Sequence, residues 1–562
     1  MSSKNKNEPV DDVPEAQDPD APGPPISVQD NGDTGEGGKL KMIVQLVKKC
    51  LGVKDIAAMR LSLPASLLEP IPNLEFSQYL DRPDVFAAIN DYDDPFERIL
   101  AVIRFAMTKD LKYIRGKVCK PYNSVLGEHF RAHWDVPPLV QPTDRDEAPI
   151  PQTHLTFPGN LASEQSPNLP SSDVASIKST RSSKSYTSGV GSFMSKGGKS
   201  PSTSATSVEA DMSQLNLQDF NGEKLRIIYL TEQISHHPPI SAYYASCPSK
   251  HLELLGIDQI SAKVSGTALK VGPGGYNKGM FVRLTGGPGE GETYQCTHPM
   301  AWVNGILRGS FYVTVSDSLI ITCTGGRHGT KFRAIVEYKE ESWLGKPHFL
   351  IEGVIHTVPE GDTQHEEWTK VKHVPPSRVV AVLDGTWRGL IRWKRVGTGS
   401  YQFATSHTAA SSPNPSQTHV ALPSPSTHTN AANASSKADL TGSNEDWNTL
   451  IDLSTLWVIP KQVRPIEKQI PYESRKLWES VTTRLLKKEY SEATKEKVAI
   501  EQKQRDIAAE RKKKGVEFVP KYFEKEISTG IPTLTEEGRK AVEEELKEKD
   551  EVVGENDKLA PP

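Results

Sequence analysis

Two adjacent histidines, His236 and His237, stand in the stretch TEQISHHPPISAYY, residues 231–244, between a serine and a Pro-Pro pair. Consecutive side chains of a strand point to opposite faces of a sheet, so both imidazoles can meet one ligand only where the backbone turns. Pro238 and Pro239 fix φ at about −65° and restrict the residue before them. The pattern therefore predicts a stiff turn that holds both imidazoles out for binding.

Three kinds of chemistry fit this stretch to different degrees. A zinc site needs further Cys, His or carboxylate ligands, and the nearby sequence has none at a usual spacing. Ser235 as a nucleophile needs a base and an oxyanion hole, but it lies at a strand end without a G-x-S-x-G elbow. An anion site needs only donors, namely imidazole N–H groups, a hydroxyl, backbone amides and lysines from elsewhere. The anion site asks least of the sequence, and histidines with purely structural partners remain the alternative.

A second polar segment is KPYNSVLGEHF, residues 120–130. Its Lys-Pro pair followed by Asn and Gly is typical of a turn-rich loop, which would present the cation of Lys120 and the amide of Asn123. A plain turn with no ligand is the alternative interpretation.

A third segment is KVAIEQKQR, residues 497–505. Lys497, Glu501 and Arg505 recur at every fourth position and so share one face of a helix. Such a row is usually a solvated face of internal ion pairs. It is also compatible with Glu501 orienting the two cations over an anionic group.

Runs that alternate apolar and polar residues dominate the chain between two Ser/Thr-rich tracts, which cover about 159–214 and about 399–445. At least eight such runs, with no regular strand–helix alternation, predict a mostly antiparallel sheet. So many strands must close or curl to hide their edges, and a large barrel can enclose a ligand. The tracts are too polar to pack a core, so we expect disordered insertions there.

Helices are expected on both sides of the strands. Residues 76–91 and 94–116 carry apolar side chains at helical spacing, and the Asp94-Pro95 pair suits a helix start. After residue 446 the chain becomes highly charged, which predicts helices with a break near Tyr490 and a stop at Gly515.

The ends of the chain have distinct compositions. Residues 1–38 are rich in Asp, Pro and Gly and are expected to be a disordered tail. LKMIVQLVKKCLGV, residues 40–53, predicts a short, partly amphipathic helix, either packed on the core or acting as a mobile, membrane-touching lid. Residues 526–562 are expected to be an acidic, solvated C-terminal tail.

Composition narrows the class of protein. The formal net charge of −4 gives no global attraction to nucleic acid, so any anion site must be local. The five cysteines are odd in number and lack CxxC spacing, which favours a reducing compartment and disfavours a disulfide scaffold or structural zinc. The chain has no run of 18 apolar residues and begins with an acidic, Pro-rich stretch. These features predict a cytoplasmic protein without a signal peptide or membrane span.

Together the three polar segments resemble the oxysterol-binding protein family. KPYNSVLGEHF is similar to the family element K-P-x-N-P-x-x-G-E-x-[FY], with Ser124 where Pro is usual. EQISHHPP, residues 232–239, is similar to the family fingerprint, and ESRKLWESVT with KVAIEQKQR resembles its C-terminal helices. The resemblance covers about 41–525 apart from the two tracts, so one domain at 39–525 is expected rather than several.

The resemblance implies an α+β fold with a large, nearly closed antiparallel β-barrel around an apolar tunnel, an N-terminal lid and flanking N- and C-terminal helices. It implies that phosphatidylinositol 4-phosphate is bound by Lys120, Asn123, His236, His237, Lys497, Glu501 and Arg505. The implied lid covers about 41–68 and includes Met42, Val44, Leu46, Val47, Leu51, Leu67 and Leu68. Neither a cofactor nor a metal is expected.

The resemblance also implies a non-enzymatic lipid-transfer protein that exchanges a sterol for phosphatidylinositol 4-phosphate in one tunnel. Phosphatidylserine as the second lipid, or a lipid sensor with little transfer, are the alternatives. EPIPNLEFSQYLDRPDVF is similar to the sterol-carrying branch, whereas LPASLLEP leans towards the phosphatidylserine branch. A hydrolase using Ser235 is disfavoured because no acid partner is visible. We expect a monomer with no separate targeting domain and brief peripheral contact with the endoplasmic reticulum, Golgi or plasma membrane.

Overall fold

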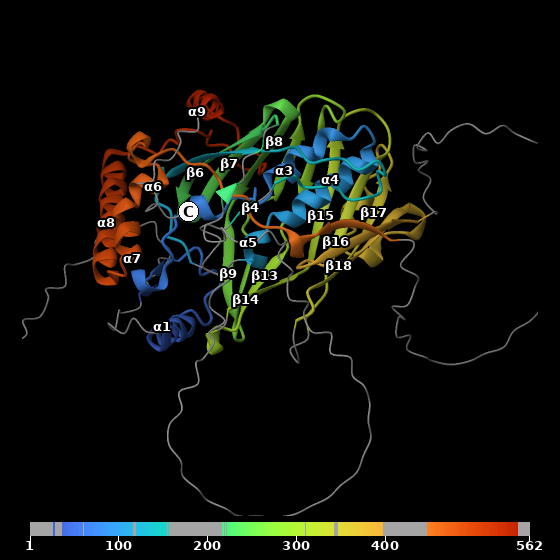
Figure 1. Ribbon diagram of the computed structural model, residues 1–562. Coiled ribbons are helices and arrows are strands. Elements are labelled where there is room, and N and C mark those ends of the chain that lie inside the picture. The colour runs from blue at the N-terminus through green and yellow to red at the C-terminus, as the bar shows by residue number, and fades with distance from the viewer. Residues whose placement is uncertain are drawn as a thin grey trace, which may run out of the picture.

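The structure is a computed structural model (Figure 1). It describes residues 26–27, 36–59, 61–115, 120–153, 155–156, 216–217, 220, 222–309, 311–341, 347–396 and 447–548. The two Ser/Thr-rich tracts and most of the expected N-terminal tail lie outside these described residues, so the predictions for them remain predictions.

The strands form one large sheet and several small ones. In chain order they are β1 (Ile26–Ser27), β2 (Leu61–Ser62), β3 (His129–Val136), β4 (Leu155–Thr156), β5 (Asn216–Leu217), β6 (Leu225–His236), β7 (Pro239–Cys247), β8 (Leu252–Asp258), β9 (Ile260–Ser265), β10 (Ala268–Pro273), β11 (Met280–Leu284), β12 (Glu292–Cys296), β13 (Met300–Asn304), β14 (Tyr312–Ser316), β15 (Ser318–Gly325), β16 (Lys331–Tyr338), β17 (Leu350–Val358), β18 (Val379–Thr386), β19 (Leu390–Arg395) and β20 (Asn448–Asp452).

The large sheet has 12 strands in the order β20-β19-β18-β17-β16-β15-β12-β11-β8-β7-β6-β3, and all its neighbouring strands are antiparallel. A second sheet of four strands has the order β14-β13-β10-β9. The predicted antiparallel sheet is therefore confirmed. Among the described strands β3 and β20 stand at the two ends of the order, so the large sheet is not a closed barrel.

The helices precede and follow the strands, as predicted. They are α1 (Glu36–Lys49), α2 (Asn73–Phe76), α3 (Pro83–Ala87), α4 (Pro95–Thr108), α5 (Leu111–Arg115), α6 (Ser474–Leu477), α7 (Glu479–Leu486), α8 (Tyr490–Lys514) and α9 (Glu536–Lys547). The predicted start at Asp94-Pro95 is confirmed, because the Asp94 carboxylate accepts a hydrogen bond from the Phe96 N–H at 2.7 Å. Gly515 ends α8 in the left-handed conformation, with φ of 63°.

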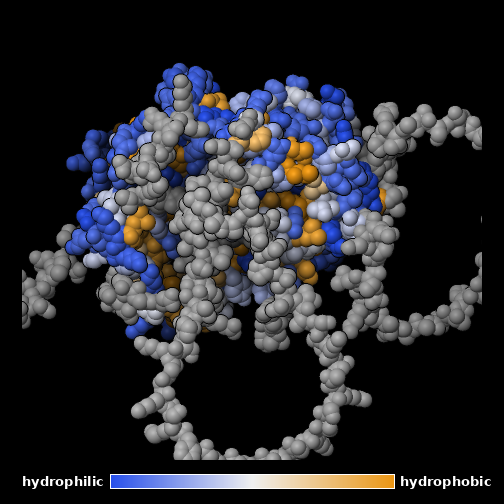
Figure 2. All heavy atoms as spheres, in the orientation of Figure 1, coloured by the Kyte–Doolittle hydropathy of each residue, from blue (hydrophilic) through white to orange (hydrophobic). Residues whose placement is uncertain are grey.

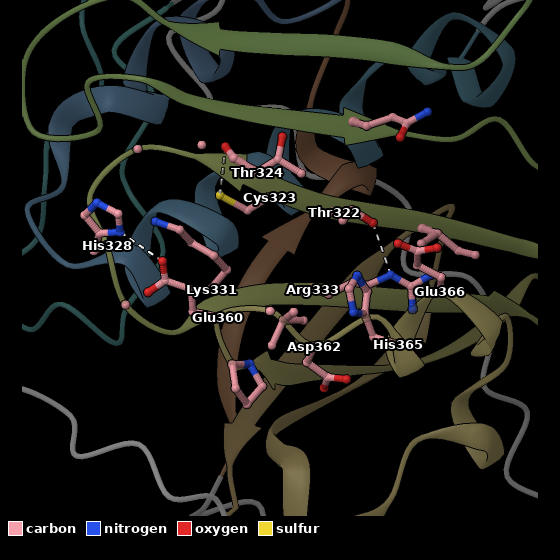
Figure 3. Close-up of a pocket in the computed structure, with 18 of the residues that line it drawn as sticks. Thr322, Cys323, Thr324, His328, Lys331, Arg333, Glu360, Asp362, His365 and Glu366 are labelled. Atoms are coloured by element: carbon pink, nitrogen blue, oxygen red, sulfur yellow. Dashed lines mark hydrogen bonds and ion pairs between the residues drawn. The ribbon is translucent and has the colours of Figure 1, made fainter.

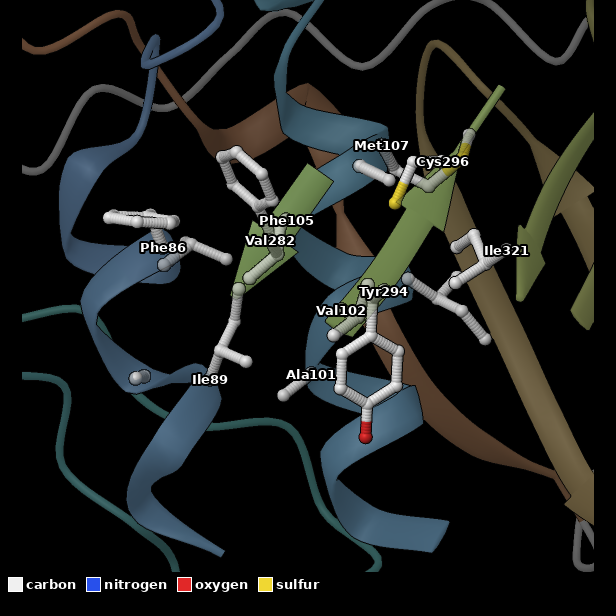
Figure 4. Packing of buried hydrophobic residues seen from close by; sticks show 14 of the residues in the cluster. Phe86, Ile89, Ala101, Val102, Phe105, Met107, Val282, Tyr294, Cys296 and Ile321 are labelled. Atoms are coloured by element: carbon white, nitrogen blue, oxygen red, sulfur yellow. The ribbon is translucent and has the colours of Figure 1, made fainter. Parts of the chain in front are cut away.

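The core lies between the sheet and the N-terminal helices. α4 is buried from Phe96 to Thr108 and packs against β16 and β20. Figure 4 shows side chains of α4, such as Val102 and Phe105, against Tyr294 and Ile321 of the sheet. Because α4 is covered all round, its apolar residues do not form a single narrow stripe.

The C-terminal segment differs from the expected solvated tail. α9 packs on β3 and β6, and its Ala541 is buried with apolar residues of the sheet. Its acidic side chains pair with two side chains of β3: Arg131 Nη1 lies 2.8 Å from Glu544 Oε2, and His133 Nδ1 lies 2.7 Å from Glu545 Oε1. The acidic side chains that predicted a free tail instead bind Arg131 and His133 of β3, and the described fold continues to Glu548.

Candidate functional site

The two histidines lie at a tight hairpin turn. β6 ends at His236, β7 begins at Pro239, and these two residues are cross-strand partners. The Ser235 hydroxyl donates to the Pro238 carbonyl at 2.8 Å, which closes the turn from the side chain. The predicted turn is confirmed, and its consequence is that the His236 and His237 rings lie together, with centroids 4.5 Å apart. The Ser235 hydroxyl proton is directed to a carbonyl rather than to a histidine.

The loop after Lys120 is built around a buried tyrosine. Tyr122 is fully buried, and its ring packs in a tilted arrangement against Trp478 with ring centroids 5.0 Å apart. Its hydroxyl is hydrogen-bonded to Thr482 Oγ1 at 3.0 Å. Lys120 Nζ donates to Asn123 Oδ1 at 2.7 Å. The cation and the amide that the sequence pattern places on this loop are thus hydrogen-bonded to each other, and the loop is anchored to α7 rather than forming a plain solvent turn.

Backbone hydrogen bonds join this loop to the histidine hairpin. The Gly127 N–H donates to the Gln233 carbonyl at 2.9 Å, and the Gln233 N–H donates to the Glu128 carbonyl at 2.8 Å. Gly127 has φ of 82°, a region open to glycine, and the Phe518 ring lies 3.4 Å from where a Cβ would stand. The loop that carries Lys120 and the strand that carries His236 are thus held side by side.

Glu128 fastens the same loop to the C-terminal helices. Its carboxylate accepts hydrogen bonds from Ser474 Oγ at 2.7 Å, from Trp478 Nε1 at 3.0 Å and from the Val125 N–H at 3.0 Å. Burial raises the pKa of Glu128 to about 7, because these hydrogen bonds only partly offset the loss of hydration. Glu128 is therefore a buried strut rather than a surface charge.

Glu232 plays a similar part on the other side of the hairpin. It accepts the backbone N–H groups of Lys521 and Tyr522, each at 2.7 Å. Burial raises the pKa of Glu232 although these bonds lower it. The first residue of EQISHHPP therefore positions the segment that follows α8. The sequence did not predict that Glu128 and Glu232 hold neighbouring segments in place. The one indication in the sequence is that each motif contains an acidic residue with no cation next to it.

α8 presents its expected face to the rest of the fold. Ala493 and Lys497 are buried, and Ile500 packs on the same cluster as Tyr122. Lys497 Nζ lies 2.6 Å from Glu501 Oε1, so the predicted ion pair within the helix is present. Because Lys497 is buried, the alternative of a fully solvated helix face is wrong at Lys497. Figure 2 shows that the visible side of α8 is mainly hydrophilic.

Arg505 lies two turns further along α8 and is half-buried. Its Nε donates to Gln502 Oε1 at 3.0 Å, and within the described ranges its guanidinium makes no ion pair with a carboxylate. The structure thus gives Arg505 a neutral partner on its own helix. The membership of Arg505 in the site stays a prediction.

The expected lid, residues 41–68, lies against α7 and α8 and against β9 and β10 of the four-stranded sheet. One apolar cluster joins it to the Tyr122 loop and to α7 and α8, and we call this the α7–α8 cluster: Leu63, Ala65, Leu68, Tyr122, Val125, Trp478, Val481, Leu485 and Ala493. The Ala65 N–H also donates to Thr494 Oγ1 at 3.1 Å. Leu46 contacts this cluster and a second one at β9 and β10.

The other residues of the expected lid are unequally packed. Met42 is buried, Val44, Val47 and Leu67 are half-buried, and Leu51 is 59% exposed. In the middle of the segment, the Ile56 N–H donates to the Ala262 carbonyl at 2.6 Å. The segment is therefore docked at several points along its length, and its function as a lid remains a prediction.

Within the described part of the chain, no helix is long and apolar enough to cross a membrane, and no group of three His, Cys, Asp or Glu side chains could hold a metal ion.

Comparison with known proteins identifies the class. The family model for oxysterol-binding protein matches residues 42–165 and 216–550. This chain belongs to the oxysterol-binding protein family.

Individual relatives agree with that assignment. The chain is 36% identical over 569 residues to oxysterol-binding protein-like protein 1 of Schizosaccharomyces pombe, covering 97% of each chain. It is 25% identical to human oxysterol-binding protein-related protein 10, matching 82% of this chain and only 43% of that protein. The chain therefore spans less than half of that human relative.

Solved structures with a similar arrangement include the Osh1 ORD domain in complex with cholesterol, at 16% identity and a TM-score of 0.49, covering 93% of this chain and 92% of that one. The Osh3 ORD of Saccharomyces cerevisiae in complex with PI(4)P has 14% identity and a TM-score of 0.46, covering 90% and 94%.

Proposed function

We propose that this chain binds the head group of phosphatidylinositol 4-phosphate at Lys120, Asn123, His236, His237, Lys497 and Arg505, with Glu501 assisting. The protein then exchanges this lipid for a second one, a sterol, between two membranes. Membership of the oxysterol-binding protein family supports the lipid class. The second lipid is the finer part of the proposal, and phosphatidylserine is the other candidate.

The observation that carries the proposal is the pair of backbone hydrogen bonds between Gln233 and the Gly127–Glu128 peptide. These bonds hold the loop of Lys120 and Asn123 beside the histidine hairpin, although more than 100 residues separate them. Tyr122 and Val125 of that loop pack in the same cluster as Ala493 of α8, one turn from Lys497. Donors from three distant segments therefore belong to one connected region.

The chemistry of these donors suits a phosphate monoester. Such a group carries close to two negative charges and several acceptor oxygens, so it favours Lys, Arg, imidazole and amide N–H donors together. Burial raises the pKa of the neighbouring Glu128 to about 7, which lowers the negative charge that would repel the ligand, and burial also raises the pKa of Glu232.

The acyl chains need an apolar enclosure, which we place inside the large sheet beneath the docked lid. The nearly closed barrel and tunnel are part of this proposal. Since one tunnel holds one lipid, the two lipids compete for it, and a gradient of the phosphoinositide drives transport of the other. The exchange involves no catalytic step, and the protein acts as a monomer that touches the cytoplasmic surface of its membranes briefly.

Lipid transfer between liposomes tests the proposal. Fluorescent sterol and labelled phosphatidylserine are followed in separate assays, each with and without phosphatidylinositol 4-phosphate in the acceptor vesicles. We expect acceleration of one lipid by the phosphoinositide, and loss of that acceleration in the His236→Ala/His237→Ala double variant. His348→Ala is the matched control, because His348 is exposed and lies on a different strand connection.

The outcome also separates the alternatives. If phosphatidylserine rather than sterol is accelerated, the second lipid is reassigned. If the phosphoinositide is extracted but neither lipid moves, the chain is a sensor and the exchange mechanism is refuted. If the double variant extracts the phosphoinositide like the wild type, the assigned head-group site is refuted.

A further inference from the structure

A polar cleft lies on the face of the large sheet that turns away from α4. Along β16, Phe332 and Ala334 point into the core with α4, so Arg333 between them points to the other face. There the β15–β16 turn and the segment after β17 wall a cleft of about 720 Å³ (Figure 3). In the order of the large sheet, β8 and β11 stand between the strands that line this cleft and the β6–β7 hairpin.

Arg333 lies at the base of this cleft and is only 4% exposed. Its Nε donates to Thr322 Oγ1 at 3.1 Å and its Nη1 donates to the Trp368 carbonyl at 2.8 Å. Both partners are neutral, and in the described part of the chain no carboxylate lies within ion-pair distance of the guanidinium. Burial lowers the pKa of Arg333 to about 10. A buried cation without a carboxylate in direct contact is costly, so an anion in the cleft would relieve this cost.

Two histidines near Arg333 each have a buried ring nitrogen without a hydrogen-bond partner among the described residues. His356 is its cross-strand partner on β17 and is fully buried, and among the described residues its Nε2 has no hydrogen-bond partner. His365 lines the cleft, and its buried Nδ1 likewise finds no partner in the described ranges. Figure 3 shows His365 beside Arg333.

The acidic side chains of the cleft are mostly engaged elsewhere. Asp362 Oδ2 lies 2.8 Å from Arg378 Nη1, and Glu360 Oε1 lies 2.9 Å from His328 Nδ1. Glu366 is the exception: it is exposed, and it is the carboxylate whose charge acts on Arg333. An entering anion would therefore compete with Glu366 for the guanidinium.

The remaining lining residues suit a hydrophilic ligand. Lys331 adds a cation beside Arg333, and hydroxyl and amide groups come from Gln295, Thr297, Thr322, Thr324 and Thr369.

We propose that this cleft binds a small phosphate compound from solution, with the phosphate on Arg333 and Lys331 and with His365 as a further donor. The site is independent of the proposed head-group site, because the two use different strands and different side chains. Arg333 supplies a planar fork that favours the oxygen pairs of phosphate.

Isothermal titration with inorganic phosphate and with glycerol phosphate tests this, using the full chain at low ionic strength matched with sodium chloride. Glu366→Gln is the decisive variant, because it removes an exposed competing charge without disturbing the core. We expect Glu366→Gln to tighten binding about two- to fivefold, the range for an exposed charge pair. Arg333→Lys should weaken it about tenfold, because the fork geometry is lost.

The His236→Ala/His237→Ala variant distinguishes this site from the proposed lipid site and should bind both soluble compounds like the wild type. Loss of binding in that variant would overturn the proposal, since the anion would then occupy the head-group site. Unchanged affinity in both Glu366→Gln and Arg333→Lys would also overturn it. A parallel assay measures how much of the double variant sediments with vesicles that contain phosphatidylinositol 4-phosphate. Adding Glu366→Gln to the double variant should leave this amount unchanged. A Glu366 effect confined to vesicles would show a lipid-borne phosphate and refute a soluble ligand.

Discussion

Replacing Glu128 separates the two consequences of burying this carboxyl group. Its side chain accepts hydrogen bonds from Ser474, Trp478 and Val125, and its burial raises its pKa to about 7. Glu128→Gln keeps an oxygen for the Trp478 and Val125 donors and turns its amide N–H towards the Ser474 hydroxyl, but it cannot ionise. Glu128→Ala removes the acceptor altogether.

The pH dependence follows from the raised pKa of Glu128. The folded state holds the proton more tightly than the unfolded chain, whose ordinary glutamate pKa is 4.5. The resulting stabilisation is complete below pH 4.5 and is lost as the pH rises through 7. Between pH 5 and pH 8 the wild type should lose about 2.5 kcal/mol of unfolding free energy from this group. Glu128→Gln should lack this loss, so its stability relative to the wild type should rise with pH.

Glu128→Ala should destabilise the fold at every pH. Trp478 Nε1 and the Val125 N–H would be buried without an acceptor, whereas Ser474 Oγ still has the His129 carbonyl at 3.2 Å. Two unsatisfied buried donors cost about 2–6 kcal/mol together. The loop of Lys120 would also lose its tie to α7, so phosphoinositide extraction should fall further than the loss of folded protein explains.

Urea unfolding at pH 5, 6, 7 and 8 measures both effects. Glu147→Gln is the matched control, because Glu147 is exposed and its change should leave the pH profile unaltered. The interpretation fails if Glu128→Gln and the wild type lose stability in parallel between pH 5 and pH 8. It also fails if Glu128→Ala is as stable as the control.

Two further variants test the helices. Lys497→Met keeps the length of a buried side chain but removes its charge, so it should weaken phosphoinositide extraction about tenfold. Lys503→Met, on the exposed side of α8, should not weaken it. Equal extraction by both variants would remove Lys497 from the site. Ala541→Asp should lower the unfolding free energy by about 3 kcal/mol, because it buries a carboxylate in the contact between α9 and the sheet. Exposed Glu543→Ala should be neutral in the same denaturation series, and a neutral Ala541→Asp would show that α9 does not stabilise the fold.

Local patterns predicted the parts of this fold that depend on neighbouring residues. The turn between His236 and Pro239 follows from two prolines, and the start of α4 follows from the Asp94-Pro95 pair, because each is decided within a few residues. The antiparallel sheet was predictable from alternation and Gly-rich turns. The packing of α9 was not, since its acidic residues meet Arg131 and His133 of β3 about 410 positions away in the chain.

The polar cleft was hidden for a related reason. Arg333 looks like an ordinary outward residue of an alternating strand, and only the segment carrying Trp368 and His365 buries it. That coverage depends on a connection after β17 folding back over the sheet. A strand pattern reports which face a residue takes, but not what later covers that face.

Glu128 and Glu232, the acidic residues of the two motifs, have functions that the sequence alone did not predict. A carboxylate beside an anion site is expected to repel the ligand, so Glu128 and Glu232 were hard to interpret as part of a phosphate-binding region. Their hydrogen bonds give the reason for their presence: each accepts donors from segments that must be held around the histidine hairpin. Burial raises the pKa of both groups, and the value of about 7 for Glu128 means that part of its charge is suppressed where it would oppose binding. The loss of hydration makes these buried carboxyl groups energetically costly. Because it also favours their neutral form, it makes them compatible with a bound anion.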